Sequence, residues 1–584
     1  MSLILLEPTD DLLAVIADRL AGEGADFSSN IVIFPEHRPG HYLRRHLARQ
    51  VGQSLIPPQI FTLDDFVNQL YFELKGGRDH YLNDLDAVAW LFEIHQQAAS
   101  PLGGSNFKTL DRFLPWGLKL LAELETLKKA AVPPEKIREF DQLIDLNLSL
   151  HSQEHFYSLS YIYEEFYKLL EARQASTLGR RFEEVKAGLP VEQLRKKRRI
   201  IVAGFFSLLE LERQIIQQLL QLENCDLVLI KGKGLSELGE KLGFPREEVS
   251  TWEEVSPAST EIEFYLSPDT HGQIFALNRV LQEKFNREGE FRPSEKQVIV
   301  LPAVETLFPL YQFTLARWRE KDFNISLGYP LSRTPLYSFF DKLFELIQNV
   351  DEADRFYIPD YLRFVLHPYI KNIFFPQTER TDLTRIMFHT LEEEFLQQKN
   401  RPFWRLEEIE SDPEVRKRLL ARFRDLTEVG EPLVCLEHLK QIHDQTIRTF
   451  LEIDSVGDFA QKIISLVEFI YQASTASQHL FFHRYAEAMV SRLEALAASQ
   501  LAPLSFETRS GYFNLFRNLI AETRVPFPGT PLRGLQVLGF WETRCLRFEE
   551  VYFLDLNEDI LPGTTKVNFL IPFHLRQQLN LPTY

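Results

Sequence analysis

Short apolar runs alternate with helix-spaced segments along much of this chain. The runs Leu3 to Leu6, Asn30 to Phe34 and Ile200 to Phe206 are almost continuously apolar, and each precedes a segment with apolar residues three or four positions apart. Such runs are typical of strands buried on both faces, as in parallel sheets. The alternation therefore predicts an α/β protein. Further strands are predicted at residues 224–230, 261–267, 297–302, 535–540 and 551–556, the last as a buried strand.

Two long stretches interrupt this alternation with helix-spaced apolar residues and little strand pattern. A chain of 584 residues is also too long for one hydrophobic core. We therefore expect several domains, with long helical stretches at residues 71–195 and 347–528.

Composition narrows the classes of protein to which this chain can belong. No window approaches the roughly 20 apolar residues of a membrane span. The three cysteines (Cys225, Cys435 and Cys545) lie far apart, which argues against a disulfide framework and favours a reducing cytoplasm. The net charge of −18 is opposite to that of a protein that coats nucleic acid. Any DNA binding must therefore come from local basic patches.

The stretch from Leu535 to Pro562 carries the most specific pattern. An apolar run, a short polar loop, a second apolar run and an acidic turn follow in order. This order resembles the motif of UvrD-like superfamily I helicases in which a loop couples DNA to nucleotide. The chain keeps this order of segments but has different residues in the loop. Its loop motif, Gly-x-x-Glu-Thr-Arg, resembles that of the AddB (RexB) subunit family, whose helicase half is inactivated. The loop positions hold Gly539, Trp541, Glu542, Thr543, Arg544, Cys545, Leu546, Arg547 and Phe548.

This resemblance covers nearly the whole chain and is most specific at residues 30–66, 198–206, 324–330 and 535–562. It implies two RecA-like parallel-sheet domains of the motor type, each with a large helical insertion. The first would take residues 1–70 and 196–265, with its insertion at 71–195. The second, which is incomplete, would take residues 266–346 and 529–584, with its insertion at 347–528. It also implies a longer subunit that continues into a PD-(D/E)XK nuclease domain with an iron–sulfur cluster and magnesium. The implied role is to bind and guide DNA in double-strand-break repair, beside an AddA-like partner that supplies ATP-driven translocation. Recognition of a recombination hotspot stays open.

Both halves of a nucleotide site are missing where the resemblance places them. The first strand-to-helix junction, Glu7 to Asp11, has neither the glycines nor the Lys of a phosphate-binding loop, and its three carboxylates would repel a triphosphate. The magnesium-binding acids align with Ala203 and Gly204. We therefore expect no nucleotide, metal or other cofactor in this segment and no catalytic residue.

Seven residues are candidates for DNA contact. Arg38 follows a strand in a Pro-x-x-Arg turn and could meet a phosphate at a helix start, and Arg44 lies on the basic helix that follows. Thr62 matches a residue in a second DNA-contacting turn of the helicases. In this chain Asp64 and Asp65 follow it, and we expect them to cap the next helix. The remaining candidates are Lys197 and Arg198 in the one dense basic run, and Trp541 and Arg544 in the loop.

Other interpretations remain open. Arg44, Arg45 and Arg49 could form only a solvated helix face, and the run from Arg195 to Arg199 could only make a strand entry soluble. For the whole chain, the alternatives are a protein–protein scaffold that uses the helical insertions and an atypical ATP-dependent helicase.

Overall fold

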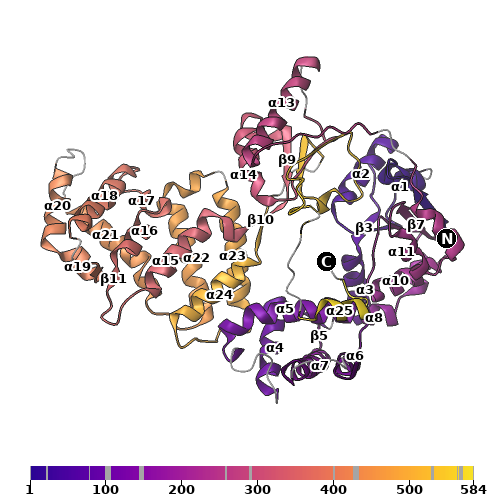
Figure 1. The fold of residues 1–584 in the computed structure, drawn as a ribbon, viewed down its shortest axis with the longest axis horizontal. Helices are drawn as coiled ribbons and strands as arrows, with labels where there is room; N and C mark the ends of the chain where they lie inside the picture. The colour runs from indigo at the N-terminus through magenta and orange to yellow at the C-terminus, as the bar shows by residue number, and fades with distance from the viewer. Residues whose placement is uncertain are drawn as a thin grey trace. The chain divides into compact units, whose positions relative to one another are not determined.

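The computed structural model describes the chain between Ser2 and Pro582, except for residues 22–23, 78, 99–106, 144–149, 257–259, 289–292, 399–400, 425–432, 480, 528–531, 562 and 564–569. It is an α/β protein with two parallel sheets, of five and four strands, and many helices (Figure 1). This architecture is consistent with two Rossmann- or RecA-like domains. Within the described residues, no helix combines the length and the apolar character needed to cross a membrane.

The first sheet has the strand order β1-β7-β6-β2-β3, and all neighbouring strands are parallel. The predicted apolar runs at its centre are confirmed: every residue of β2 is buried, and so are the first five of β7. The strands are β1 (Ser2–Leu6), β2 (Asn30–Phe34), β3 (Gln59–Thr62), β6 (Arg199–Ala203) and β7 (Cys225–Ile230).

Helices cover both faces of this sheet, because alternate strand residues point to opposite sides. On one face, Val32 and Phe34 belong to a core with α1 (Leu12–Leu20) and α2 (Arg38–Val51). On the other, Ile31 and Ile33 belong to a second core with α3 (Leu63–Lys75) and several later helices. Those helices are α8 (Leu178–Ala187), α10 (Glu210–Leu220) and α11 (Leu235–Leu242).

The second sheet has the order β15-β8-β14-β9 and is also parallel. Its strands are β8 (Gln297–Val300), β9 (Phe323–Ser326), β14 (Leu535–Leu538) and β15 (Glu550–Phe553). The helices α13 (Thr270–Glu288) and α14 (Leu307–Phe313) precede and follow β8. Along the edge strand, Lys284 of α13 forms an ion pair with Glu550 at 2.7 Å.

Two strand predictions need correction. Residues 261–267 have no regular structure, and Phe264 and Leu266 are 83 % and 104 % exposed. The last strand is β15, at the edge of its sheet, and its Val551 and Phe553 are 49 % and 41 % exposed, so it is not a buried strand. In both cases the apolar pattern is real, but no described element covers it.

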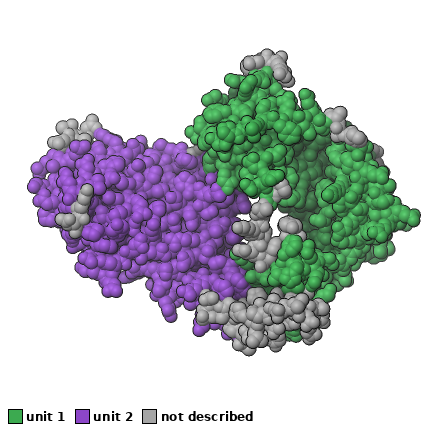
Figure 2. All heavy atoms as spheres, in the orientation of Figure 1, with its two compact units in different colours: residues 1–83, 119–327, 527–584 green, residues 84–118, 328–526 purple. Residues whose placement is uncertain are grey.

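The chain divides into two compact units (Figure 2). Unit 1 consists of residues 1–83, 119–327 and 527–584 and contains both parallel sheets. Unit 2 consists of residues 84–118 and 328–526. The other helices of unit 1 are the C-terminal part of α5 (Leu110–Lys129), α6 (Pro134–Leu143), α7 (Leu150–Ala172), α9 (Val191–Arg195), α12 (Arg246–Val249) and α25 (Phe573–Gln578), and it also contains the pair β4 (His80–Tyr81) and β5 (Ala175–Ser176).

Unit 2 is mostly helical. Its first helix, α4 (Asp84–Gln97), contacts a helix that comes much later in the chain. The Asp84 carboxylate accepts hydrogen bonds from Arg492 of α23 (Phe482–Ala498) at 2.6 and 3.1 Å. The later helices of unit 2 include α15 (Pro335–Gln348), α16 (Ile358–Val365), α17 (Pro368–Lys371), α18 (Asp382–Gln397), α19 (Leu406–Ser411), α20 (Pro413–Arg424), α21 (Val434–Gln445), α22 (Val456–Ala473), α23 and α24 (Arg509–Ala521). Short antiparallel pairs join β10 (Gly328–Pro330) to β13 (Arg524–Pro526) and β11 (Phe356–Tyr357) to β12 (Phe403–Trp404).

Candidate nucleic-acid interface

The connections of the first sheet place a topological switch point at its carboxyl edge, and we call this position the crevice. The strands β2 and β6 are neighbours, but α2 leaves β2 toward one face and α10 leaves β6 toward the other. In open α/β sheets, ligands bind at this kind of switch point, beyond the carboxyl ends of the strands. Here the crevice lies between the turn at residues 35–38 and the turn at residues 204–206.

A loop from the second sheet reaches this crevice. Residues 541–543 form a 3₁₀ turn after β14, and Cys545 then packs against Gly204, with its thiol 3.8 Å from the Gly204 carbonyl oxygen. Gly204 has φ +77°, and a Cβ there would collide with the Cys545 sulfur. Position 204 therefore requires glycine for two reasons. Burial raises the pKa of the Cys545 thiol to about 12, so this sulfur stays protonated.

Three of the candidate residues come together here. The Arg544 guanidinium lies 4.4 Å from the centre of the Trp541 ring, and its Nη1 is 3.9 Å from Glu36 Oε1. Arg38 starts α2, and burial lowers its pKa, while Tyr42 and the nearby Glu542 favour its charged form. Trp541 is 61 % exposed. The group thus presents an accessible aromatic ring with the Arg544 guanidinium over it, and Arg38 lies within electrostatic reach of Glu542 in the same loop.

Phe206 adds an exposed ring that sequence reasoning missed. It lies two residues after Gly204 and is 48 % exposed. The available signal was the pair Phe205-Phe206 after β6: Phe205 is buried in the core, which leaves its neighbour outside. Exposed aromatic side chains beside cations are the elements that bind single-stranded nucleic acid by stacking.

Thr62 also lies at the carboxyl edge, but its hydroxyl is already used. It is the N-cap of α3: Thr62 Oγ1 accepts from the Asp65 backbone N–H at 3.2 Å and donates to Asp65 Oδ2 at 2.9 Å. The prediction that Asp64 and Asp65 cap this helix is therefore wrong in detail, because the capping residue precedes them. Asp64 instead accepts from Lys129 at 3.3 Å.

The basic face of α2 is partly engaged within the chain. Arg45 and Arg49 form ion pairs with Glu295 at 3.0 and 3.4 Å, and the Arg45 side chain is only 17 % exposed. The alternative of a fully solvated helix face is therefore wrong for Arg45. Arg44, in contrast, is exposed.

The structure separates Lys197 and Arg198 from the other candidates. Both precede β6, whereas Arg38, Thr62, Trp541 and Arg544 lie at or beyond the carboxyl ends of strands. Parallel strands all begin at one edge of a sheet and end at the other. The basic run therefore lies at the amino edge, where Lys197 donates to Gln59 at 3.2 Å.

Protein carboxylates occupy the start of α1, where a motor enzyme would hold phosphate. Asp11 accepts from the backbone N–H groups of Leu13 and Ala14 at 3.0 and 3.1 Å. Glu7 forms an ion pair with Lys231 at 2.8 Å, and this contact lowers its pKa. A helix N-terminus attracts anions, and here the anion is a side chain of the chain itself.

Within the described residues, no group of three or more His, Cys, Asp or Glu side chains is placed to hold a metal ion. Comparisons with known proteins find neither a matching family model nor a matching curated protein.

Proposed function

We propose that this chain is the catalytically inactive, helicase-like portion of an AddB-type subunit, with two RecA-like domains, and that it binds and guides a DNA strand in break repair. The observation that carries the proposal is the exposed Trp541 ring, with the Arg544 guanidinium 4.4 Å from its centre, at the switch point of the first sheet. An ATP-driven partner subunit would move the strand, and a cytoplasmic location follows from the same role.

Two kinds of contact support binding of a single strand at this edge. Trp541 and Phe206 offer ring surface to unstacked bases, at a typical contribution of about 1–3 kcal/mol per base. Arg38, Arg44 and Arg544 offer positive charge to the backbone, which fixes the position of the strand without reading its sequence. The overall charge of −18 makes such a local group necessary.

The residues at the expected nucleotide site do not support a working ATP-driven motor. Asp11 and Glu7 place negative charge where a triphosphate would bind, and Ala203 and Gly204 supply no carboxylate for magnesium. Movement along DNA would then depend entirely on the partner.

The test is the binding of a labelled single-stranded oligonucleotide, measured by fluorescence anisotropy at several salt concentrations. We expect salt-dependent binding that Trp541→Ala weakens by about 5- to 150-fold, the equivalent of one lost stacking contact. Arg544→Ala should weaken binding and also reduce the salt slope by about one. Arg246→Ala, whose side chain is 88 % exposed at a distant position in the sequence, is the matched control and should bind normally. Negligible binding at low salt by the folded chain would refute the proposal.

A protein–protein scaffold is the second candidate, favoured by exposed apolar side chains outside the crevice. Ile262, Phe264 and Leu266 are 67 to 104 % exposed, and Val551 and Phe553 are exposed at a sheet edge. Exposed apolar side chains mark an interaction site where they form a contiguous patch. Stable co-purification of a partner by a chain that binds no DNA would favour this role.

A further inference from the structure

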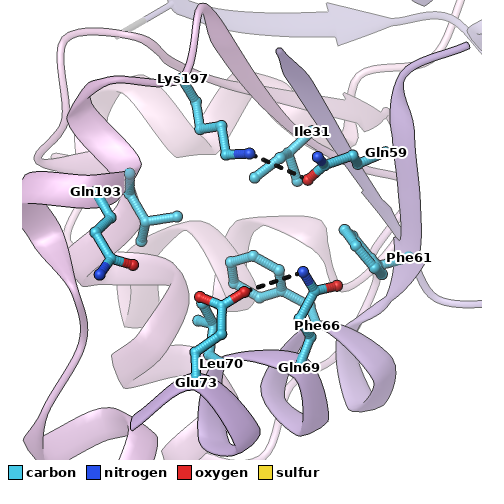
Figure 3. A pocket seen from close by; sticks show the side chains of 10 residues that line it. Ile31, Gln59, Phe61, Phe66, Gln69, Leu70, Glu73, Gln193 and Lys197 are labelled. Atoms are coloured by element: carbon cyan, nitrogen blue, oxygen red, sulfur yellow. Dashed lines mark hydrogen bonds between the residues drawn. The ribbon is translucent and has the colours of Figure 1, made fainter. Parts of the chain in front are cut away.

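A pocket of about 300 Å³ opens at the amino edge of the first sheet (Figure 3). Its residues come from β2, β3, α3, α9 and the basic run. Ligand sites of doubly wound sheets, including the crevice described above, lie at the carboxyl edge. This pocket is therefore separate from the proposed strand-binding edge and from the start of α1. Its volume is at the lower end of the range for small-molecule sites.

One wall of the pocket is apolar and aromatic. Phe61 and Phe66 stand with their ring centres 6.1 Å apart and tilted by 50°, next to Ile31, Leu70 and Leu194. In Figure 3, Phe61 of β3 and Phe66 and Leu70 of α3 line one side of the pocket. A flat ligand with π-electron density would gain most from such a wall, because aromatic rings pair by offset or edge contacts.

The polar groups converge from the remaining sides. Gln69 Nε2 donates to Glu73 Oε1 at 3.1 Å, so that a carboxylate acceptor and an amide donor stand side by side. Across the pocket, Lys197 donates to Gln59, and Gln193 contributes a further amide (Figure 3). Neither Lys197 nor Glu73 has an ion-pair partner among the described residues.

Further positive charge adjoins Lys197 in the chain. Lys196 and Arg198 are exposed on either side of it, whereas Arg195 at the end of α9 forms an ion pair with Glu192 at 3.0 Å. An anionic group would therefore be favoured at this end of the pocket, while the opposite end, at Glu73, favours hydrogen-bond donors.

We propose that this pocket binds a nucleotide unit, with its phosphate at Lys197 and its base against Phe61 and Phe66. The Glu73 carboxylate accepts from an exocyclic amino group of the base, and the adjacent Gln69 amide donates to a neighbouring ring acceptor. Cytosine presents this edge, whereas thymine presents a carbonyl oxygen in place of the amino group and would place one acceptor against another at the carboxylate. The pocket therefore prefers an amino-bearing base.

The probes are dCMP, dTMP and deoxyribose 5-phosphate, titrated into the full chain by calorimetry. We expect saturable binding of dCMP, about tenfold weaker binding of dTMP, and the weakest binding of the sugar phosphate. Glu73→Gln should abolish the difference between dCMP and dTMP, and Lys197→Met should weaken both. Lys440→Met, which removes an exposed lysine of unit 2 that does not line the pocket, is the matched control.

Two further arms identify the source of the nucleotide and separate this inference from the proposed function. If the pocket takes a nucleotide within a strand, Glu73→Gln weakens a dC oligonucleotide more than a dT oligonucleotide; if it takes a free nucleotide, neither changes. Trp541→Ala should leave dCMP binding unchanged. Circular dichroism checks the fold of each variant, whose altered side chain reaches the surface. No saturable binding of dCMP, or equal binding by Lys197→Met, would overturn the inference.

Discussion

The two units of this chain differ in the surroundings of their polar and aromatic side chains. In unit 2, aromatic rings pack against one another, as in the stacked pair Phe344 and Phe513 at 4.3 Å, and His443 bonds both Tyr361 and Glu410 while fully buried. In unit 1, the Trp541 ring is exposed, and Arg38 Nη1 is buried without a hydrogen-bond partner. Unit 2 also buries polar atoms without a partner among the described residues, Tyr369 Oη and His438 Nδ1. The difference therefore lies in the exposed Trp541 ring with the Arg544 guanidinium beside it, and not in the number of satisfied groups.

Residue types that are common in catalytic sites do not by themselves identify a site. The network of Tyr361, His443 and Glu410 has the residue types of a catalytic group, but burial and mutual hydrogen bonding make it a link between helices. Trp541 and Arg544 are ordinary residue types, and their exposure at a switch point makes them candidates.

The largest expected effect is an acid-induced loss of stability in unit 2. Burial lowers the pKa of His367 and of His438 to about 4, from an ordinary value of 6.5. Each is neutral when folded and binds a proton more readily when unfolded. Stability is therefore fully present above pH 6.5 and falls as the pH drops toward 4, by about 3 kcal/mol per histidine. Hydrogen exchange in α18 and α21 at pH 7 and at pH 4.5 measures this loss.

A variant sharpens the assignment to one residue. His438→Gln can keep a hydrogen bond to Thr384, which now contacts His438 Nε2 at 2.9 Å, but it cannot take up a proton. The variant should lose about half of the pH dependence in unit 2. An unchanged pH profile would contradict the assignment to His438.

The second largest expected effect is a loss of stability around α25 in unit 1. Arg576 in α25 is 2 % exposed and pairs with the buried Glu123 of α5; it also donates to the Pro582 carbonyl oxygen at 2.7 Å. Arg576→Ala would leave the Glu123 carboxylate buried without its partner, at a cost of about 3–5 kcal/mol. Hydrogen exchange should rise in α25 and α5, with little change in unit 2.

Two controls accompany this variant. Arg547→Ala removes an exposed arginine of unit 1 and should be nearly neutral. The double variant Arg576→Met with Glu123→Leu replaces the pair with apolar side chains and should recover most of the lost stability. An equal loss in the double variant would mean that packing, and not the unpaired charge, sets the cost.

Sequence patterns predicted the sheets better than the contacts between them. Asn30 to Phe34 is apolar throughout because both faces of the central strand β2 are covered, so the pattern and the structure agree. Residues 261–267 have an equally apolar pattern, but a pattern gives only the capacity to form a strand, and no described strand pairs with it.

The candidate site was predicted in part for the same reason. Parallel topology places Arg38 and Thr62 at one edge of the sheet and Lys197 at the other, which follows once the strands are known. The contact between Gly204 and Cys545 joins residues 341 positions apart, and no local pattern encodes it. Exposure of Phe206 likewise depends on how its neighbour packs.

The smallest expected effect tests this long-range contact. Gly204→Ala adds a Cβ that collides with the Cys545 sulfur and places a side chain at φ +77°, at a cost of about 2 kcal/mol. Because Cys545→Ala removes the sulfur, the double variant should recover the part due to the collision and keep the backbone strain of about 1 kcal/mol. Urea unfolding of the four variants in the cycle measures the coupling. Simple additivity would mean that the loop does not rest on Gly204 in solution, and the Trp541 group would then lose its fixed position at the crevice.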